Sequence, residues 1–428
     1  MYSIQILKRI DESKDEIVRT TRELIQIPSE NKPPHGYEKE CQEYIARKFR
    51  EVGMDVDIFL PTDVEGLIGH PGFLKGRDYT GRPNVVGAFK GEGGGKSLIL
   101  SGHMDTSPKE PMPWGAHGPF SGDVENGRIY GRGAFDMKGG LIAAFIAAKA
   151  IRECDIDLKG DLFVESVVDE EFGGANGTLA CRLRGYEADA AINPECSSLL
   201  ICPATRGDQN YKITVKGTPG MPYTGERTIN PVYGMARIIQ ALRDFQAFRN
   251  MKERHPLYRD DLDPVPVIIK KLKAGEVERD GALGIPIDSW LLVGCQTYPG
   301  TSEKEIDEEF FKFMDAAVKS DPELAVNPPS YEKQFRYVWP SEIPKDHPIV
   351  VEVARSFEMA AGRKGKVQGA PFPCDAFIFT MYSRTPVLVF GPGGANAHAP
   401  NEFVFIEDLI IVAKTLALTI LKWCGEAS

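Results

Sequence analysis

The stretch LILSGHMDTSP, residues 98–108, begins as a predicted buried strand and ends in a turn with side chains that could bind a ligand. Its apolar start gives way at Gly102 to His103 and Asp105, which stand two positions apart. Side chains two positions apart on a strand point to the same side. A carboxylate beside a histidine can fix the imidazole tautomer while the other ring nitrogen binds a metal ion. Open α/β sheets bind ligands at the carboxyl ends of their strands, so the stretch predicts a ligand site, with a surface ion pair as the alternative.

The chain has 428 residues of ordinary globular composition, a length that suggests two or three domains. Its N-terminus mixes charged and apolar residues, unlike a signal peptide, and no apolar run is long enough to span a bilayer. A net charge of −10 argues against nucleic-acid binding, so the basic cluster Lys270, Lys271 and Lys273 is interpreted as a solvated face. The eight cysteines show no CxxC spacing and are interpreted as reduced thiols, which indicates a cytoplasmic protein.

Strand and helix patterns alternate along most of the chain. Apolar runs predict strands over residues 56–60, 84–89, 97–102, 162–168, 188–193 and 386–390. Helical periodicity predicts helices over residues 15–27, 36–53, 139–151, 347–362 and 406–423. The stretch KGEGGGK, residues 90–96, is interpreted as a hairpin tip between two of these strands. The alternation predicts an α/β fold with a mixed, mostly parallel sheet sandwiched by helices.

The pattern changes near residue 207. A strand over 211–217, a helix over 230–245, a strand over 289–300 and a charged helix over 302–318 predict a small α+β domain. The sheet pattern then resumes near residue 340. We therefore expect one domain made of residues 1–206 and 338–428, with residues 207–337 inserted into it.

Further carboxylates and a second histidine stand at strand ends or helix starts. Asp136 lies between glycines just before a predicted helix, where the alternative role is a helix N-cap. Asp169, Glu170 and Glu171 follow a buried strand, and adjacent carboxylates repel one another unless a cation neutralises them. Glu195 and His398 each follow another strand. Carboxylate and imidazole ligands suit Zn²⁺, Mn²⁺ or Co²⁺, and the set fits a two-metal site.

These motifs resemble a known family. SGHMD, GRGAFDMKGG, DEEFGG, NPE and GPGGANAHAPNEF occur in an order and spacing similar to the co-catalytic metallo-aminoacylase and carboxypeptidase family. That family includes acetylornithine deacetylase, succinyl-diaminopimelate desuccinylase and glutamate carboxypeptidase. The resemblance implies a bridging Asp136, with His103 and Glu195 on one metal ion and His398 and Glu171 on the other. It further implies Glu170 as general base, Asp105 as support for His103, and a lid in the inserted block that forms a homodimer.

One position departs from the family pattern. In the lid motif VKGTPGMPYTGERTIN, Asn230 is in place, but Met221 stands where the family has a histidine that donates to the oxyanion. A thioether cannot donate a hydrogen bond. Another group could substitute, Tyr223 and Arg227 being near in sequence, or the residue could have been altered to trap a substrate. Alternatively, the reaction needs no such donor, as in deamination of an electron-poor aromatic ring.

The sequence thus predicts a cytoplasmic metallohydrolase that cleaves a carbon–nitrogen bond of a small molecule, such as an N-acyl group or a peptide. We expect two divalent metal ions, either Zn²⁺ or Mn²⁺, and Co²⁺ would also suit the ligands. Whether both metal positions are filled stays open. Two alternatives are a hydrolytic deaminase similar to nitroanthranilate aminohydrolase and a catalytically silent binding protein. No nucleic-acid or membrane partner is expected. The candidate substrate contacts are Met221, Tyr223, Arg227, Asn230 and Asp375.

Overall fold

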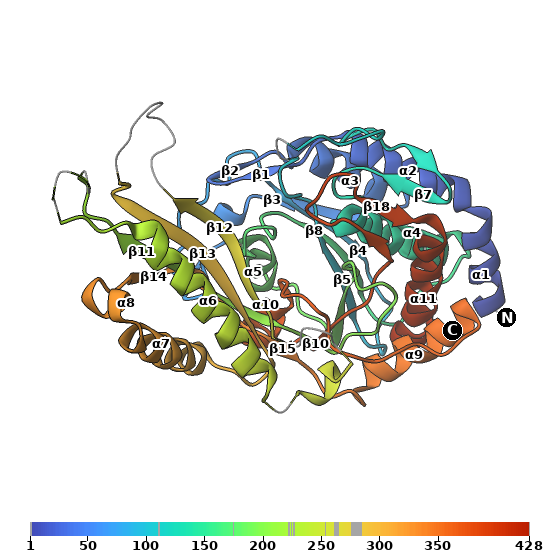
Figure 1. The fold of residues 1–428 in the computed structure, drawn as a ribbon. Helices are drawn as coiled ribbons and strands as arrows, with labels where there is room; N and C mark the ends of the chain where they lie inside the picture. The colour runs from blue at the N-terminus through green and yellow to red at the C-terminus, as the bar shows by residue number, and fades with distance from the viewer. Residues whose placement is uncertain are drawn as a thin grey trace. The chain divides into compact units, whose positions relative to one another are not determined.

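The computed structural model describes residues 2–109, 112–173, 175–220, 223, 225, 227–252, 254–260, 265–274 and 285–427 (Figure 1). The chain divides into two compact units. Unit 1 comprises Met1–Thr205, Ser341–Ala370 and Cys374–Ser428, and unit 2 comprises Arg206–Pro340 with Pro371–Pro373. The block predicted over residues 207–337 lies within the continuous part of unit 2.

Unit 1 is built on a six-stranded sheet whose strand order is β16-β9-β5-β8-β4-β3. Its strands, in that order, are Val387–Val389, Ala190–Asn193, Leu98–His103, Leu162–Val167, Asn84–Phe89 and Asp55–Phe59. The pairs from β16 to β8 are parallel, and β4 and β3 extend the sheet with antiparallel pairs. The sheet is therefore mixed and mostly parallel, as predicted.

Helices cover both faces of this sheet, with α4 and α11 on one side and α5 and α10 on the other (Figure 1). The helices of unit 1 are α1 Tyr2–Glu12, α2 Lys14–Gln26, α3 Lys39–Glu51, α4 Gly139–Glu153, α5 Asn176–Leu183, α9 Pro348–Ala361, α10 Ala376–Tyr382 and α11 Ile406–Cys424. Every residue of the central strands β5 and β8 is buried. Continuous apolar runs are typical of parallel strands that are covered on both faces. The predicted sandwich is confirmed.

The hairpin predicted for residues 90–96 is wrong. Strand β8 lies between β4 and β5, pairing antiparallel with β4 and parallel with β5. Strands β4 and β5 are neighbours in sequence, but they do not pair with each other. The glycine-rich stretch is therefore a connection between separated strands, because the strand pairing that inserts β8 is a long-range contact that local turn signals cannot report.

Short strands complete unit 1. A small antiparallel sheet has the order β17-β18-β7-β6, and two further strand pairs are β1–β2 and β10–β15. Their bounds are β1 Asn31–Lys32, β2 His35–Gly36, β6 Val124–Glu125, β7 Arg128–Tyr130, β10 Ala204–Thr205, β15 Ser341–Glu342, β17 Gly394–Ala395 and β18 Phe403–Phe405. Strand β18 pairs with β7, which brings the C-terminal glycine-rich motif to the segment that precedes α4.

Unit 2 is an antiparallel sheet of order β12-β13-β11-β14 packed against helices. Its elements are β11 Gly207–Lys216, α6 Pro231–Asn250, β12 Val267–Ala274, β13 Asp288–Thr297, α7 Glu303–Ser320, α8 Pro322–Val326 and β14 Ser330–Val338. The sequence did not predict β12 and β14. Both are edge strands with mostly exposed or half-buried side chains, so neither shows the apolar run of a core strand.

The basic cluster predicted as a solvated face lies on β12. Its first member is bound to other side chains: Lys270 Nζ lies 2.7 Å from Asp208 Oδ2 and 2.8 Å from Asn210 Oδ1 on the same sheet. Among the described residues, no helix has the length and apolar character needed to cross a membrane. All eight cysteines are free thiols.

Candidate metal centre

His103 is the last residue of β5, and its side chain is 1% exposed. Its Nδ1 lies 2.8 Å from the main-chain oxygen of Asp105, so Nδ1 donates a proton to that oxygen and Nε2 is the nitrogen that a metal ion would bind. Nε2 lies 3.2 Å from Asp136 Oδ1 and 3.4 Å from Glu195 Oε1. The end of β5 thus directs one imidazole nitrogen at two carboxylates.

Asp136 lies in an irregular helical turn, Ala134–Lys138, directly before α4. Its φ and ψ of −119° and 95° are not helical, and its side chain does not cap the helix, so the N-cap alternative does not hold. Glu402 Oε1 accepts hydrogen bonds from the amides of Phe135 and Asp136 at 3.0 and 3.1 Å. A buried carboxylate therefore fixes this turn, and the two oxygens of Asp136 face His103 and His398.

Glu195 follows β9 in a loop that touches the start of α4. A Cβ on Gly140 would lie 1.7 Å from the main-chain oxygen of Pro194, so only glycine permits this approach. The Glu195 side chain is 4% exposed, and burial raises its pKa to about 7 despite the attraction of His103. His103, Asp136 and Glu195 each place one potential ligand atom within 4.8 Å of the others.

A second group of potential ligands shares Asp136. His398 Nε2 lies 3.0 Å from Asp136 Oδ2 and 2.7 Å from Glu171 Oε2. Glu171 is fixed from its other oxygen, because Oε1 accepts a hydrogen bond from the amide of Ser107 at 2.8 Å. Asp136 therefore gives Oδ1 to the first group and Oδ2 to the second, which is the arrangement of a carboxylate that bridges two ions.

The spacing and charge of these donors fit divalent cations. A tetrahedral ion with bonds of about 2.0–2.2 Å places neighbouring ligand atoms about 3.3–3.6 Å apart. Of the four separations given above, those of 3.0, 3.2 and 3.4 Å are close to that value, and the 2.7 Å contact of His398 with Glu171 is shorter. Each group combines imidazole nitrogen with carboxylate oxygen, the mixture that suits Zn²⁺, Mn²⁺ or Co²⁺.

The carboxylates also dominate the titration of the two histidines. The charge of Glu171 and the contact with Asp136 raise the pKa of His398 to about 12, against the opposing effect of burial. Burial lowers the pKa of His103, but Glu195 and Asp136 outweigh it and raise the pKa well above its usual value. Burial acts to raise the pKa of Asp136, but the hydrogen bonds with His103 and His398 outweigh it, so the pKa of Asp136 is lowered. The centre thus attracts positive charge strongly.

Glu170 lies beside both groups without belonging to either. Its Oε2 is 3.9 Å from His103 Nε2, and its side chain is 16% exposed. Burial raises its pKa well above the usual value, and the neighbouring carboxylates of Glu195 and Asp375 act in the same direction, while His103 opposes them. A carboxylate of raised pKa beside a metal site has the properties of a general base.

Asp105 lies beside His103, as predicted, but it contacts the imidazole chiefly through its main chain. Its carboxylate lies 3.7 Å from His103 Nδ1, so only its main-chain oxygen contacts the imidazole. Its Oδ1 and Oδ2 instead accept hydrogen bonds from the amides of Glu170 and Glu171, both at 3.1 Å. The reason is that β5 ends at His103, so the alternation of a strand no longer applies at Asp105. Asp105 therefore holds the backbone that carries Glu170.

Sequence reasoning missed other residues around the centre. Asn31 Nδ2 donates to Asp105 Oδ2 at 2.8 Å and to Asp169 Oδ1 at 3.0 Å, and no motif marked it. Arg132 NH1 lies 2.7 Å from Glu402 Oε2. Both Arg132 and Glu402 stand inside the quoted motifs, so the motifs themselves were the signal that could have found them.

The predicted substrate contacts are placed as follows. Asp375 is 4% exposed, with one oxygen bonded to Thr178 and the other 2.7 Å from Asn193 Nδ2. Tyr223, in unit 2, is 72% exposed. Asn230 caps α6 by accepting from the amide of Val232 at 3.0 Å, and with Arg227 it lines a hollow of about 530 Å³ in unit 2. Met221 lies outside the described residues.

Comparison with known proteins identifies relatives along the whole chain. The sequence profile of peptidase family M20/M25/M40 matches residues 99–422. The N-formyl-4-amino-5-aminomethyl-2-methylpyrimidine deformylase of Bacillus subtilis strain 168 is 30% identical, over 100% of this chain and 98% of its own length. These relatives favour neither the aryl-amine deaminase nor the silent binding protein.

Two solved structures share the fold. Human carnosine dipeptidase 1 superposes with a TM-score of 0.73 at 15% identity, over 99% of both chains. A dinuclear metal-binding peptidase of the M20 family from Bacillus subtilis superposes with a TM-score of 0.61 at 16% identity, over 96% of this chain and 99% of its own. The resemblance seen in the sequence motifs is thereby confirmed: the chain belongs to peptidase family M20/M25/M40 and is a metal-dependent hydrolase of carbon–nitrogen bonds.

Proposed function

We propose that the chain is a two-metal amidase that removes a formyl group or a similarly small acyl group from an amine. The observation that carries the proposal is the pair of donor groups that share Asp136, with Glu170 Oε2 3.9 Å from His103 Nε2. Support for the substrate class comes from the deformylase relative, whose similarity extends over the whole chain.

In this proposal His103, Asp136 and Glu195 hold one ion, and Asp136, Glu171 and His398 hold the other. Zn²⁺ or Mn²⁺ is the expected metal, with Co²⁺ also suited, because the donors are imidazoles and carboxylates. Bound there, the ions would polarise the carbonyl of the substrate and lower the pKa of water. Hydrogen bonds hold two of these donors in place: the amide of Asp136 donates to Glu402, and the amide of Ser107 donates to Glu171.

Glu170 carries the proton transfers. It accepts a proton from the attacking water, whose oxygen forms the new bond to the carbonyl carbon. It then delivers the proton to the departing nitrogen as the carbon–nitrogen bond breaks, so that water and amide become carboxylic acid and amine. Asp105 keeps Glu170 in position through its hydrogen bond to the Glu170 amide. The raised pKa of Glu170 suits a group that must take up a proton and return it.

Several narrower predictions belong to the same proposal. Unit 2 is expected to act as a lid and to form a homodimer, and the chain is expected in the cytoplasm. Tyr223, Arg227 and Asn230 are the proposed substrate contacts of unit 2, together with Met221. Asp375 is the proposed contact of unit 1, although its two oxygens are already bonded to Thr178 and Asn193.

The experiment that tests the function measures three products with the purified chain loaded with Zn²⁺, Mn²⁺ or Co²⁺. Formate release is measured from N-formyl-4-amino-5-aminomethyl-2-methylpyrimidine, and acetate release from its N-acetyl analogue. Ammonia release is measured from aminobenzoates and nitroaminobenzoates. We expect formate to form fastest, with loss of activity on chelation and recovery when metal is restored. Ammonia as the main product, or activity that chelators leave unchanged, would refute the proposal.

A further inference from the structure

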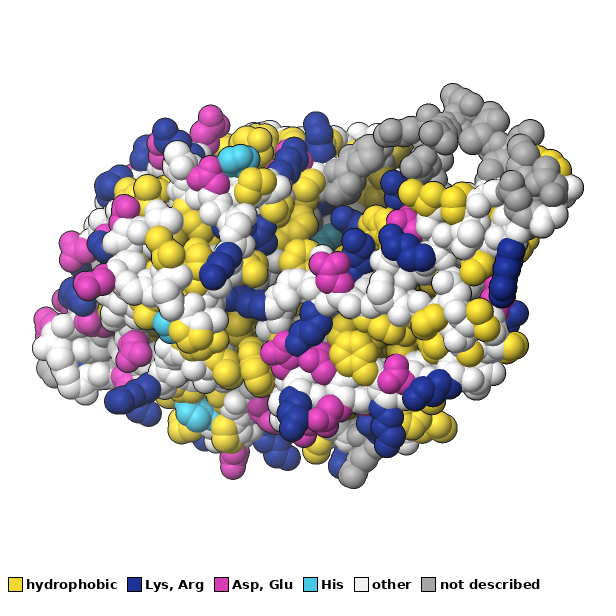
Figure 2. All heavy atoms as spheres, turned by 90° about the vertical axis from the view of Figure 1, so that its left-hand side faces the viewer, with side chains coloured by type: hydrophobic (Ala, Val, Ile, Leu, Met, Phe, Trp, Pro, Cys, Tyr) yellow, Lys and Arg dark blue, Asp and Glu magenta, His cyan; other side chains and the backbone are white. Residues whose placement is uncertain are grey.

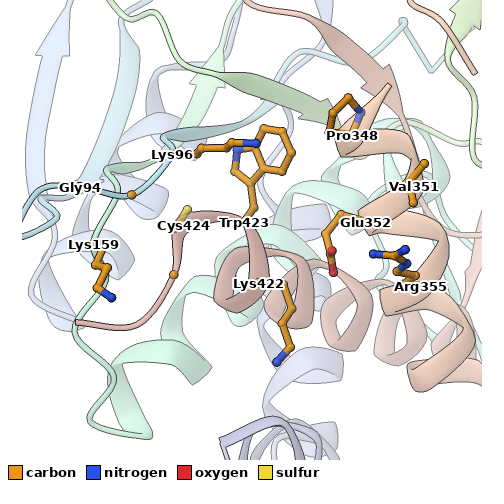
Figure 3. Close-up of a pocket in the computed structure, with 12 residues that line it drawn as sticks. Gly94, Lys96, Lys159, Pro348, Val351, Glu352, Arg355, Lys422, Trp423 and Cys424 are labelled. Atoms are coloured by element: carbon orange, nitrogen blue, oxygen red, sulfur yellow. The ribbon is translucent and has the colours of Figure 1, made fainter. Parts of the chain in front are cut away.

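The glycine-rich stretch 90–96 serves neither the sheet pairing nor the metal centre, yet it borders a hollow of about 490 Å³ in unit 1. Figure 3 shows the hollow between this stretch, the helix α9 and the end of α11. Its lining includes Gly94, Lys96, Lys159, Arg355 and Lys422. The hollow therefore joins parts of the chain that are far apart in sequence.

Backbone contacts fix the stretch in this place. The amide of Gly93 donates to the main-chain oxygen of Lys159 at 2.8 Å. A Cβ on Gly95 would lie 2.1 Å from the main-chain oxygen of Cys424, so only glycine fits there. Gly94 has a φ of +81°, and a Cβ on it would meet nothing within 4 Å. Within the described part of the chain, no residue accepts a hydrogen bond from the amides of Gly94, Gly95 or Lys96.

The lining is strongly basic. It has four cationic side chains, from Lys96, Lys159, Arg355 and Lys422, and one acidic side chain, from Glu352. None of the four cations forms an ion pair with a described residue. The chain as a whole has a net charge of −10, and on the face in Figure 2 acidic and basic side chains are intermixed. Cations gathered in a hollow of an acidic protein raise the local concentration of anions.

The aromatic ring at the hollow cannot stack on a ligand. Trp423 is 8% exposed, and Lys96 Nζ lies 4.3 Å from the centre of its ring (Figure 3). Its indole nitrogen donates to the main-chain oxygen of Ser97 at 3.0 Å. Recognition must therefore rest on charge and hydrogen bonds, which lysine, arginine and free amides provide for phosphoryl oxygens.

We propose that this hollow is a binding site for the phosphoryl group of a small phosphorylated metabolite or of inorganic phosphate or pyrophosphate. The site is separate from the metal centre. Strand β5 begins at Leu98, two positions after Lys96, and ends at His103, a span of about 17 Å at about 3.3 Å per residue. Binding of the anion therefore does not require the catalytic groups.

The test uses isothermal titration of the metal-loaded chain with inorganic pyrophosphate. The variant K96Q/K159Q removes two of the four cations. The matched control K8Q/K39Q makes the same change of charge on unit 1 at two side chains that are 77% and 66% exposed. We expect the first variant to weaken binding about tenfold or more, and the control to stay within twofold, with the amidase activity unchanged in both.

Further ligands define the chemistry of the site. Inorganic phosphate and glycerol 3-phosphate distinguish a free anion from a phosphate ester, and citrate tests whether any polyanion suffices. Pyrophosphate that binds at the metal ions would be insensitive to K96Q/K159Q, so the difference between the two variants isolates the hollow. Equal binding by both variants, or citrate that binds as tightly as pyrophosphate, would overturn the proposal.

Discussion

Glu170 and Glu171 are adjacent, chemically identical side chains to which the structure gives different surroundings. Glu171 Oε2 lies 2.7 Å from His398 and belongs to a donor group, whereas Glu170 belongs to neither group. The same substitution at the two positions should therefore have separable effects. E170Q should keep the metal ions and lose turnover, and E171Q should lose metal.

The size of the effect at Glu170 follows from its role. Removal of a general base costs about 10²–10⁴-fold in kcat, which is about 2.7–5.4 kcal/mol of activation free energy. Because burial raises the pKa of Glu170, it is a stronger base than an exposed carboxylate, and we expect the upper part of this range. The amide of Gln keeps the size of the side chain, and the backbone stays bound to Asp105, so the fold should be unchanged.

The assay pairs formate release with metal content measured by elemental analysis. E171Q serves as the matched control. Loss of a residue that only hydrogen-bonds to a metal ligand typically lowers metal affinity about 10–100-fold. Because Glu171 is itself a proposed ligand, E171Q should lower metal affinity by more than that. Turnover in E170Q above a tenth of the parent value would refute the assignment of the base. Metal loss in E170Q equal to that in E171Q would show that the structure separates the two residues wrongly.

Three further predictions follow from the same geometry. Because the pKa values of His103 and His398 are raised, both carry protons at neutral pH without metal, so metal binding must release protons. Metal affinity should therefore rise with pH, and titrations in buffers of different ionisation enthalpy should detect the proton release. G140A should destabilise the fold by about 1–3 kcal/mol and weaken metal binding, whereas the control G69A, which has open space, should melt like the parent. N31A should lower kcat about tenfold if Asn31 acts by positioning, and a change in KM alone would contradict that role.

The sequence predicted the mixed, mostly parallel sheet, and its candidate ligands lie close together in the structure. All of the motifs except that of Asp136 stand where an apolar run ends, and such runs are strong signals because core strands are buried on both faces. The convergence of His103, Asp136 and Glu195 then follows from the parallel strands β5 and β9, whose carboxyl ends meet at one edge of the sheet. The ligand candidates were therefore accessible from pattern alone.

What could not be predicted depends on contacts between distant segments. The insertion of β8 between β4 and β5 is a long-range pairing, so the local turn signal at residues 90–96 misled the interpretation. Asp105 lies two residues beyond the end of β5, so strand alternation does not set its direction, and its carboxylate bonds the amides of Glu170 and Glu171 instead of the imidazole. Asn31 is buried among groups from three segments, and a lone asparagine carries no periodic signal.

The carboxylate that bridges the two donor groups has a consequence for the order in which the centre can assemble. All residues of the first group precede position 205. The second group also needs His398, which lies between the edge strand β16 and the last helix. A chain cut short before that histidine would lack a donor of the second group, and it would also lack Glu402, which holds the turn that carries Asp136. Occupancy of the second position therefore reports that the C-terminal segment has returned to the sheet.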